Sequence, residues 1–235
     1  MRVLALDTTT AEGSVAVVDD DRVLVERRGS AVCSHTERLP TDLLTALADC
    51  GLTPSDVDIF AVASGPGSFT GIRTGIATIQ GMAFVTKRQV VPVSALTALA
   101  VAAALECSPG AIVGAWMDAH RREVFSALFL VQEGPSFGID RLQAIDPPAA
   151  GDPAETLARW VDASTIPACV VGDGAVLYAS TLAARTRVVP PPALASVIGR
   201  IAVACARAGG AVDPAGVQPF YVRRPDVEVA RDRAR

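Results

Sequence analysis

The sequence predicts an α/β protein built from two similar lobes, each with the element order βββαβαβα and the second one reduced. Short apolar runs bounded by turn residues indicate strands, and longer runs with apolar residues three and four positions apart indicate helices. In the first half, three strands precede alternating helices and strands. The same order then recurs, so we predict one lobe at residues 1–108 and a smaller one at residues 109–235.

The first half begins with three strands, which we expect at residues 2–7, 14–19 and 22–28. The turns between them are short, and strands joined in this way form an antiparallel meander. An apolar, uncharged strand at 59–64 is typical of a position buried on both faces of a sheet. The other elements expected in this half are a helix at 35–50, a helix at 70–87, a strand at 89–93 and a helix at 94–106.

The second half repeats features of the first. Its opening strand ends at Asp118, as the first strand of the chain ends at Asp7, 111 residues earlier. Two later strands that run into glycine turns, at 61–67 and 169–174, are 108 residues apart. These offsets indicate two copies of one fold. The other elements expected here are strands at 123–131, 139–145 and 187–189 and helices at 153–163, 175–184 and 194–208.

Composition excludes several classes of protein. Half of the residues are hydrophobic and the net charge is only −4, so the chain is not intrinsically disordered. A net negative chain is a poor nucleic-acid binder by itself, because phosphate contacts supply that affinity. The five cysteines form no CxxC pair, which argues against a zinc ribbon or a redox motif. The longest uncharged run, residues 89–105, is too short to span a membrane. We therefore expect a cytoplasmic protein with no membrane partner.

The densest motif is the glycine loop between the strand at 59–64 and the helix at 70–87. One interpretation is a cradle for a phosphate or carboxylate, because free amides at a helix start attract anions. Another is a tight turn with a Ser or Thr cap. Three glycines four residues apart also favour close approach of a second helix, the interpretation we prefer. The residues concerned are Gly65, Gly67, Ser68, Thr70, Gly71 and Gly75.

Three further turns are candidate nucleotide or anion loops. Asp7, Thr8 and Thr9 resemble the first phosphate loop of the actin and sugar-kinase ATPase superfamily, although threonines stand where glycine is usual. The matching Asp118 has no glycine after it, and an Asp that simply turns one strand into the next is the alternative. The turn containing Gly172 and Gly174 is a candidate for holding an adenosine. The chain has two histidines and no HxxxH or HExxH motif, so we expect no metal site.

Six segments in order resemble the TsaB (YeaZ-type) family, whose fold is the ASKHA fold, also described as actin-like ATPase or RNase H-like. The most specific is GPGSFTG followed by an arginine. The resemblance is strong over about residues 1–130. The segments are VLALDTTTAEGSVAV at 3–17, SHTERLPTDLLTAL at 34–47, FAVASGPGSFTGIRTGIATIQGMA at 60–83, VPVSALTALA at 91–100, DAHRREVFSALF at 118–129 and PFYVR at 219–223.

The resemblance implies a non-catalytic subunit. The family pairs with TsaD, which transfers a threonylcarbamoyl group to an adenosine of tRNA, and the ATPase TsaE joins them. No cofactor is expected on the isolated chain; ATP or ADP within the complex, and a homodimer in the absence of TsaD, stay open. The pairing would use the helices at 35–50 and 70–87, so the expected partner-binding residues are Leu43, Leu44, Leu47, Gly71, Ile72, Gly75, Ile76 and Ile79.

One segment distinguishes the chain from TsaD itself. TsaD has V-N-H-x-x-G-H after the same helix, and its two histidines bind metal. Here Ala95 and Leu99 stand at the histidine positions, and neither side chain can ligate a cation. The alternative functions are an independent ATPase or small-molecule kinase on the same fold and, more distantly, a metallopeptidase.

Overall fold

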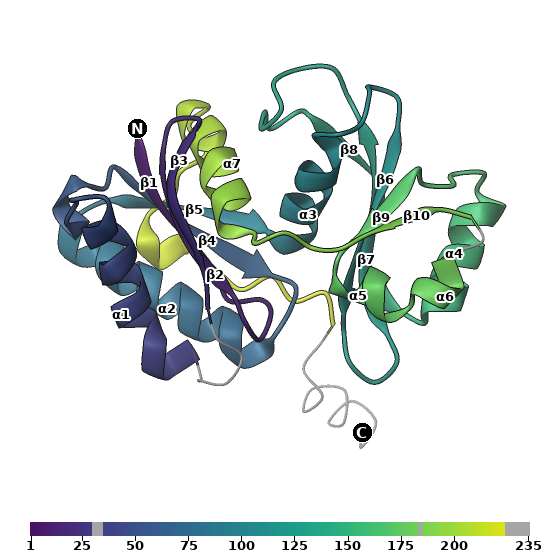
Figure 1. Ribbon diagram of the computed structural model, residues 1–235, viewed down its shortest axis with the longest axis horizontal. Helices are drawn as coiled ribbons and strands as arrows, with labels where there is room; N and C mark the ends of the chain where they lie inside the picture. The colour runs from purple at the N-terminus through teal and green to yellow at the C-terminus, as the bar shows by residue number, and fades with distance from the viewer. Residues whose placement is uncertain (30–34, 183–184, 224–235) are drawn as a thin grey trace.

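The computed structural model describes residues 1–29, 35–182 and 185–223, and it places the described strands in two five-stranded sheets (Figure 1). The first sheet has the order β3-β2-β1-β4-β5. Strands β1, β2 and β3 are antiparallel, whereas β1, β4 and β5 run parallel. The bounds are β1 Arg2–Asp7, β2 Ser14–Asp19, β3 Arg22–Arg28, β4 Ile59–Gly65 and β5 Gln89–Ser94.

The second sheet repeats the topology of the first. Its order, β10-β9-β6-β7-β8, again places the third, second, first, fourth and fifth strands of the repeat side by side, read from the opposite edge. The duplication expected from the sequence is therefore confirmed in the strand order. The bounds are β6 Ile112–Asp118, β7 Val124–Val131, β8 Leu142–Gly151, β9 Cys169–Val171 and β10 Arg187–Val189.

The strand predictions agree best where the pattern is strongest. The first three strands have the bounds expected from the sequence. Strand β8 begins later than predicted and extends to Gly151. The helix expected at 175–184 is two short helices, α5 Asp173–Leu177 and α6 Ala179–Leu182, because Tyr178 leaves the helical backbone region.

Helices cover the outer face of each sheet (Figure 1). On the first sheet, α1 and α2 enclose an apolar core built with β1, β2 and β4. On the second, α4, α5 and α6 lie on the outer side, where Trp116 and Trp160 are the largest buried residues. The bounds of the longer helices are α1 His35–Asp49, α2 Phe69–Thr86, α3 Ala95–Ala104, α4 Pro153–Asp162 and α7 Ala195–Arg207, and two 3-10 turns are η1 Pro54–Asp56 and η2 Pro214–Gly216.

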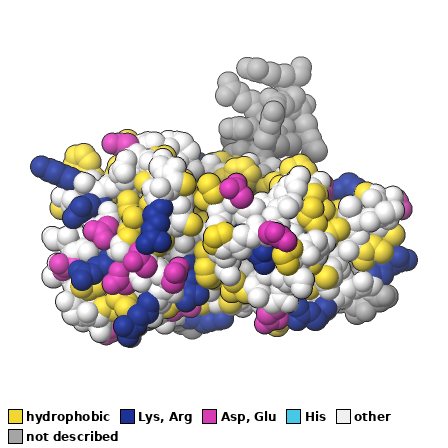
Figure 2. Space-filling view, turned by 90° about the horizontal axis from the view of Figure 1, so that it is seen from above, with side chains coloured by type: hydrophobic (Ala, Val, Ile, Leu, Met, Phe, Trp, Pro, Cys, Tyr) yellow, Lys and Arg dark blue, Asp and Glu magenta, His cyan; other side chains and the backbone are white. Residues whose placement is uncertain are grey.

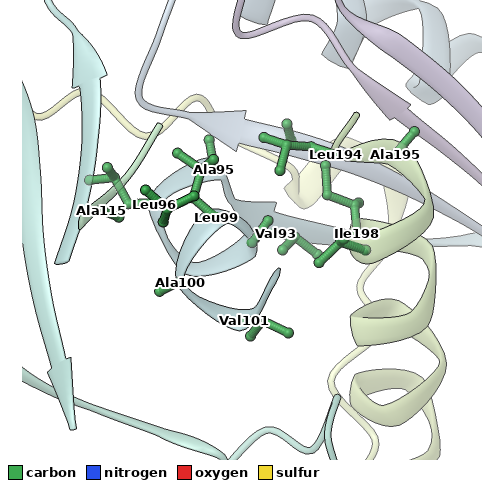
Figure 3. Packing of buried hydrophobic residues seen from close by; sticks show 14 of the residues in the cluster. Val93, Ala95, Leu96, Leu99, Ala100, Val101, Ala115, Leu194, Ala195 and Ile198 are labelled. Atoms are coloured by element: carbon green, nitrogen blue, oxygen red, sulfur yellow. The ribbon is translucent and has the colours of Figure 1, made fainter. Parts of the chain in front are cut away.

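The last helix of each half packs mainly on the sheet of the other half. Helix α3 contacts β6 and β7, and α7 contacts β1 and β2. Figure 3 shows Leu99 of α3 between Ala115 of β6 on one side and Ile198 of α7 on the other. The strands divide between the two sheets as the predicted lobes, residues 1–108 and 109–235, would place them, and the two helices α3 and α7 pack across that division. Because α3 is apolar on nearly all sides, it stabilises the fold most when it lies between the two sheets.

The chain after α7 also returns to the first lobe. Val212 pairs with Val90 through two main-chain hydrogen bonds of 2.9 Å, and Gln80 of α2 donates to the carbonyl oxygen of Pro214 at 2.7 Å. Further on, the N–H of Phe220 donates to the carbonyl oxygen of Ser64 at 2.7 Å. Among the described residues, none of the helices combines the length and apolar character needed to cross a bilayer.

Candidate functional site

The turn after β1 is closed by its own side chains. Thr9 donates to Oδ1 of Asp7 twice, from its main-chain N–H at 2.9 Å and from its hydroxyl at 2.6 Å. Both residues are buried. Asp7 therefore has the geometry of an Asp that organises a turn between two strands. This geometry favours the turn interpretation of the motif over a phosphate loop.

The glycine loop before α2 is filled by this turn. The main-chain N–H of Ser68 donates to the carbonyl oxygen of Thr9 at 2.8 Å. A Cβ atom on Gly67 would overlap Thr9, and Cβ atoms on Gly71 or Gly75 would overlap Thr8. The close approach predicted from the glycine spacing exists, but the turn after β1 makes it instead of a second helix.

The start of α2 supports the capping interpretation of the glycine loop. The hydroxyl of Ser68 accepts a hydrogen bond from the N–H of Gly71 at 3.2 Å, so Ser68 is the N-cap. Thr70 lies in the first turn with its side chain exposed. Gly65 lies at the end of β4, where a Cβ atom would overlap the carbonyl oxygen of Phe220.

The residues predicted to bind a partner lie mostly inside the molecule. Leu43, Leu47, Ile72, Ile76 and Ile79 are buried in the core beneath α1 and α2. This prediction is wrong for them, because they form the face with which the two helices pack on their own sheet. Of the predicted apolar side chains, Leu44 is the exposed one, at 52%.

A different face of α2 is exposed. Ala77, Gly81, Phe84 and Val85 are four, seven and eight positions apart along the helix and therefore lie on one side of it. Phe84 is 79% exposed and Val85 is 80% exposed. We call these four residues the α2 surface. Phe84 and Val85 do not follow the spacing of the core positions of α2. This apolar pair was the feature of the sequence that could have predicted the α2 surface.

In the second lobe, Asp118 organises the turn between β6 and β7. Its Oδ1 accepts from the N–H of His120 at 2.8 Å, and its Oδ2 lies 3.2 Å from Nδ1 of the same histidine. The N–H of Asp118 donates to Oδ1 of Asp173 at 3.2 Å. Burial raises the pKa of Asp173 above its usual value, although hydrogen bonds from main-chain N–H groups oppose this.

Gly172 and Gly174 are fitted closely to the second sheet. A Cβ atom on Gly172 would overlap the carbonyl of Trp116, and one on Gly174 would overlap the main chain at Met117 and Asp118. Gly172 also has φ of 129°, a conformation that favours glycine. These glycines therefore let the start of α5 pass over β6, which explains them without a bound adenosine.

Two cavities lie where the lobes meet. The first, about 560 Å³, brings Gly67, Ser68 and Thr70 of the glycine loop together with Asp118. We call it the junction groove; its other lining residues are Pro66, Phe69, Ile72, Ala119, His120, Arg121, Phe125, Phe220, Tyr221, Val222 and Arg223. The second, about 380 Å³, is lined by Asp7 and Asp173 from opposite lobes. The sequence analysis did not predict the aromatic residues of the groove. The PFYVR segment, which contains two of them, was the feature that could have indicated them.

The PFYVR segment fastens the lobes together at the groove. Tyr221 stacks on Phe69 with ring centroids 5.3 Å apart. Arg223 forms an ion pair with Glu123 and donates to the carbonyl oxygen of Ala119 at 3.1 Å, both in the second lobe. Among residues 1–29, 35–182 and 185–223, no three His, Cys, Asp or Glu side chains gather as a metal site would require.

The sequence comparisons support one family. A family model described as TsaD, tRNA N6-adenosine threonylcarbamoyltransferase, matches residues 30–136. An uncharacterised protein of Mycobacterium tuberculosis is 31% identical over 96% of this chain and 93% of its own length. The tRNA threonylcarbamoyladenosine biosynthesis protein TsaB of Haemophilus influenzae is 38% identical, over 53% of this chain and 52% of its own length.

A solved structure agrees with the sequence comparisons on the family. YeaZ from Pseudomonas aeruginosa superposes with a TM-score of 0.77 at 29% identity, covering 94% of this chain and 99% of that one. The chain belongs to the TsaB/YeaZ family. Component A of the (R)-2-hydroxyglutaryl-CoA dehydratase of Acidaminococcus fermentans, with a TM-score of 0.52 and 10% identity over 88% of this chain and 99% of that one, shares the fold alone. The ASKHA-type α/β fold predicted from the sequence is thereby confirmed for this chain.

Proposed function

We propose that this TsaB/YeaZ protein is a non-catalytic subunit for tRNA threonylcarbamoyladenosine biosynthesis that binds TsaD directly, with TsaE joining the complex. Relatives that carry the TsaB name support the pathway. The α2 surface is the observation that carries the pairing. A phenylalanine and a valine exposed side by side on a helix are costly in water and are typical of a protein interface.

The α2 surface has the shape that a helix interface needs. Ala77 and Gly81 leave its centre flat, and a Cβ atom on Gly81 would have no neighbour within 4 Å. A partner helix can therefore approach α2 closely there, while Phe84 and Val85 supply apolar area to be buried. This surface replaces the inward-facing residues that the sequence suggested.

The absence of TsaD activity is proposed from two core residues. Ala95 and Leu99, which occupy the positions of the metal-binding histidines in the TsaD pattern, are buried in the core between the lobes. Neither carries a donor atom in its side chain, and both pack against apolar neighbours. A divalent cation would find no ligand here.

A second candidate function is an ATPase or small-molecule kinase. The observation in its favour is the 380 Å³ cavity, in which Asp7 and Asp173 lie across the lobe junction. Against it, Thr9 fills the space beside Gly67 that a phosphate would need. Calorimetry of the isolated chain with ATP and magnesium tests this alternative. A binding heat that saturates at ATP concentrations close to the protein concentration would favour it over the scaffold function.

The pairing is tested by co-expression with TsaD of the same organism and size-exclusion chromatography. We expect co-elution for the natural sequence and a loss of affinity of more than about tenfold for Phe84→Asp and for Val85→Asp. Leu177→Asp on α5 is the matched control, because Leu177 is also an exposed apolar residue, but in the other lobe. Failure of the natural chain to co-elute would overturn the proposal, and co-elution of both α2 variants would show that another surface is used.

A further inference from the structure

One wall of the junction groove is aromatic and exposed. Phe69 is 44% exposed and Phe220 is 40% exposed, and both line the groove. Tyr221, stacked on Phe69, continues the wall. Exposed aromatic rings in a cavity provide flat apolar faces on which planar ligands stack.

The aromatic wall is held rigidly. The Arg73 guanidinium lies 4.0 Å from the centroid of the Phe69 ring, and its Nε donates to the hydroxyl of Tyr221 at 2.7 Å. Phe220 is anchored through its main-chain N–H to Ser64 of β4. Tyr221 and Arg73 already lie against the Phe69 ring, so a ligand stacks mainly on Phe220, beside an aromatic cluster that the fold has ordered in advance.

The opposite wall is a strained basic turn. His120, Arg121 and Arg122 have φ angles of 57°, 54° and 65°, three consecutive left-handed residues without a glycine. Each such residue costs about 1–3 kcal/mol and is typical of a functional turn. Asp118 and the main-chain bond from Ala119 to Glu123 hold the turn in this form.

The charge at the groove is opposite to that of the chain. Arg121 and Arg223 line the groove, Arg73 packs on its aromatic wall, and Arg122 follows Arg121 in the turn. The carboxylates there are Asp118, which lines the groove, and Glu123, which pairs with Arg223. The whole chain has a net charge of −4. On the face seen from above, by contrast, basic and acidic side chains are interspersed (Figure 2).

From these features we infer that the junction groove binds a single-stranded RNA segment. Stacking faces combined with arginines are what single-stranded RNA requires, since its unstacked bases stack on aromatic rings and its phosphates pair with cations. A volume of about 560 Å³ is large enough for a splayed nucleotide. The inference rests on the proposed function in tRNA modification and gives this subunit a direct RNA contact.

The test measures fluorescence anisotropy of a labelled single-stranded RNA of about 12 nucleotides with the full chain, over a range of salt concentrations. We expect Arg121→Glu/Arg122→Glu to lower the affinity at least about tenfold and the salt slope by about 1.4, as the loss of two phosphate contacts predicts. Phe220→Ala should lower the affinity about tenfold through lost stacking. The matched control, Arg22→Glu/Arg185→Glu, makes the same charge change at exposed residues that belong neither to the groove nor to the turn between β6 and β7.

The inference is overturned if the natural chain binds no RNA or if the groove and control pairs lose equal affinity. Unchanged binding by Phe220→Ala, or equal binding of an RNA duplex, would also overturn it. If AMP displaced the RNA at a concentration equal to that of the RNA, the inference would also be overturned, because the groove would then be a mononucleotide pocket. Co-elution of the same variants with TsaD separates the two proposals. Retained pairing with lost RNA binding supports the inference, and failed pairing of the natural chain counts against the proposed function alone.

Discussion

Gly71 of α2 lies so close to Thr8 that a Cβ atom on the glycine would overlap the threonine carbonyl oxygen. The contact interlocks the start of α2 with the turn after β1. Since Thr8 is fully buried, neither partner has room to move aside. The spacing of glycines that suggested a partner surface thus serves internal packing at this position.

Replacing Gly71 should therefore damage the fold. We expect Gly71→Ala to lower the free energy of unfolding by about 1–3 kcal/mol, the usual cost of overpacking. Gly81→Ala in the same helix has open space around it and should raise the free energy of unfolding by up to about 1 kcal/mol, because alanine is the better helix former. Urea unfolding measures both, and equal effects would contradict the packing described for Thr8.

The half-buried carboxyl of Asp173 should make stability depend on pH. Because its pKa is raised in the folded protein, the folded state binds this proton more tightly than the unfolded state does. The stability it contributes is fully present below its ordinary pKa and is lost as pH rises through the raised value. Asp173→Asn removes this loss and keeps an oxygen to accept the N–H groups of Asp118 and Gly174.

We therefore expect the stability of Asp173→Asn, relative to the natural chain, to increase between pH 4 and pH 7. Urea unfolding at several pH values measures the difference, with Asp140→Asn, at an exposed site, as control. A difference that stays constant with pH would show that Asp173 does not titrate as described.

Cys169 should resist alkylation. Burial, and to a smaller extent the neighbouring Cys107, raises the pKa of its thiol to about 11, so little thiolate forms at pH 8. We expect iodoacetamide at pH 8 to leave Cys169 unmodified in the folded protein and to modify it in urea, as measured by peptide mass spectrometry. Equal modification rates in both conditions would contradict the buried position on β9.

Asp146 should stabilise the second lobe through Trp160. Its Oδ2 accepts from the indole N–H at 2.6 Å, and Arg159 also pairs with it at 2.7 Å. Asp146→Ala leaves the N–H of a buried tryptophan unpaired, so we expect the free energy of unfolding to fall by about 1–3 kcal/mol. Asp146→Asn, which retains an acceptor, should lose less; tryptophan fluorescence during urea unfolding provides the measurement.

The strands and most helices followed from local pattern. Apolar runs bounded by turn residues located β1, β2 and β3 at their observed bounds, and the recurrence of a strand ending in Asp revealed the duplicated topology. These features depend on residues that are neighbours in the chain, so they can be predicted from the sequence alone. The division of the helix at Tyr178 could not be predicted, since no residue there marks the break.

The sequence alone determined the fold class, the repeat and the family, because these depend on the order of strands, helices and motifs. Tertiary structure decided what each apolar face and each glycine contacts. Periodicity shows that Ile72 and Ile76 share a face with Ile79, but only packing shows that their own sheet covers it. Likewise, α3 and α7 exchange sheets, and PFYVR reaches the junction groove, through contacts between residues far apart in the chain, which no local pattern encodes.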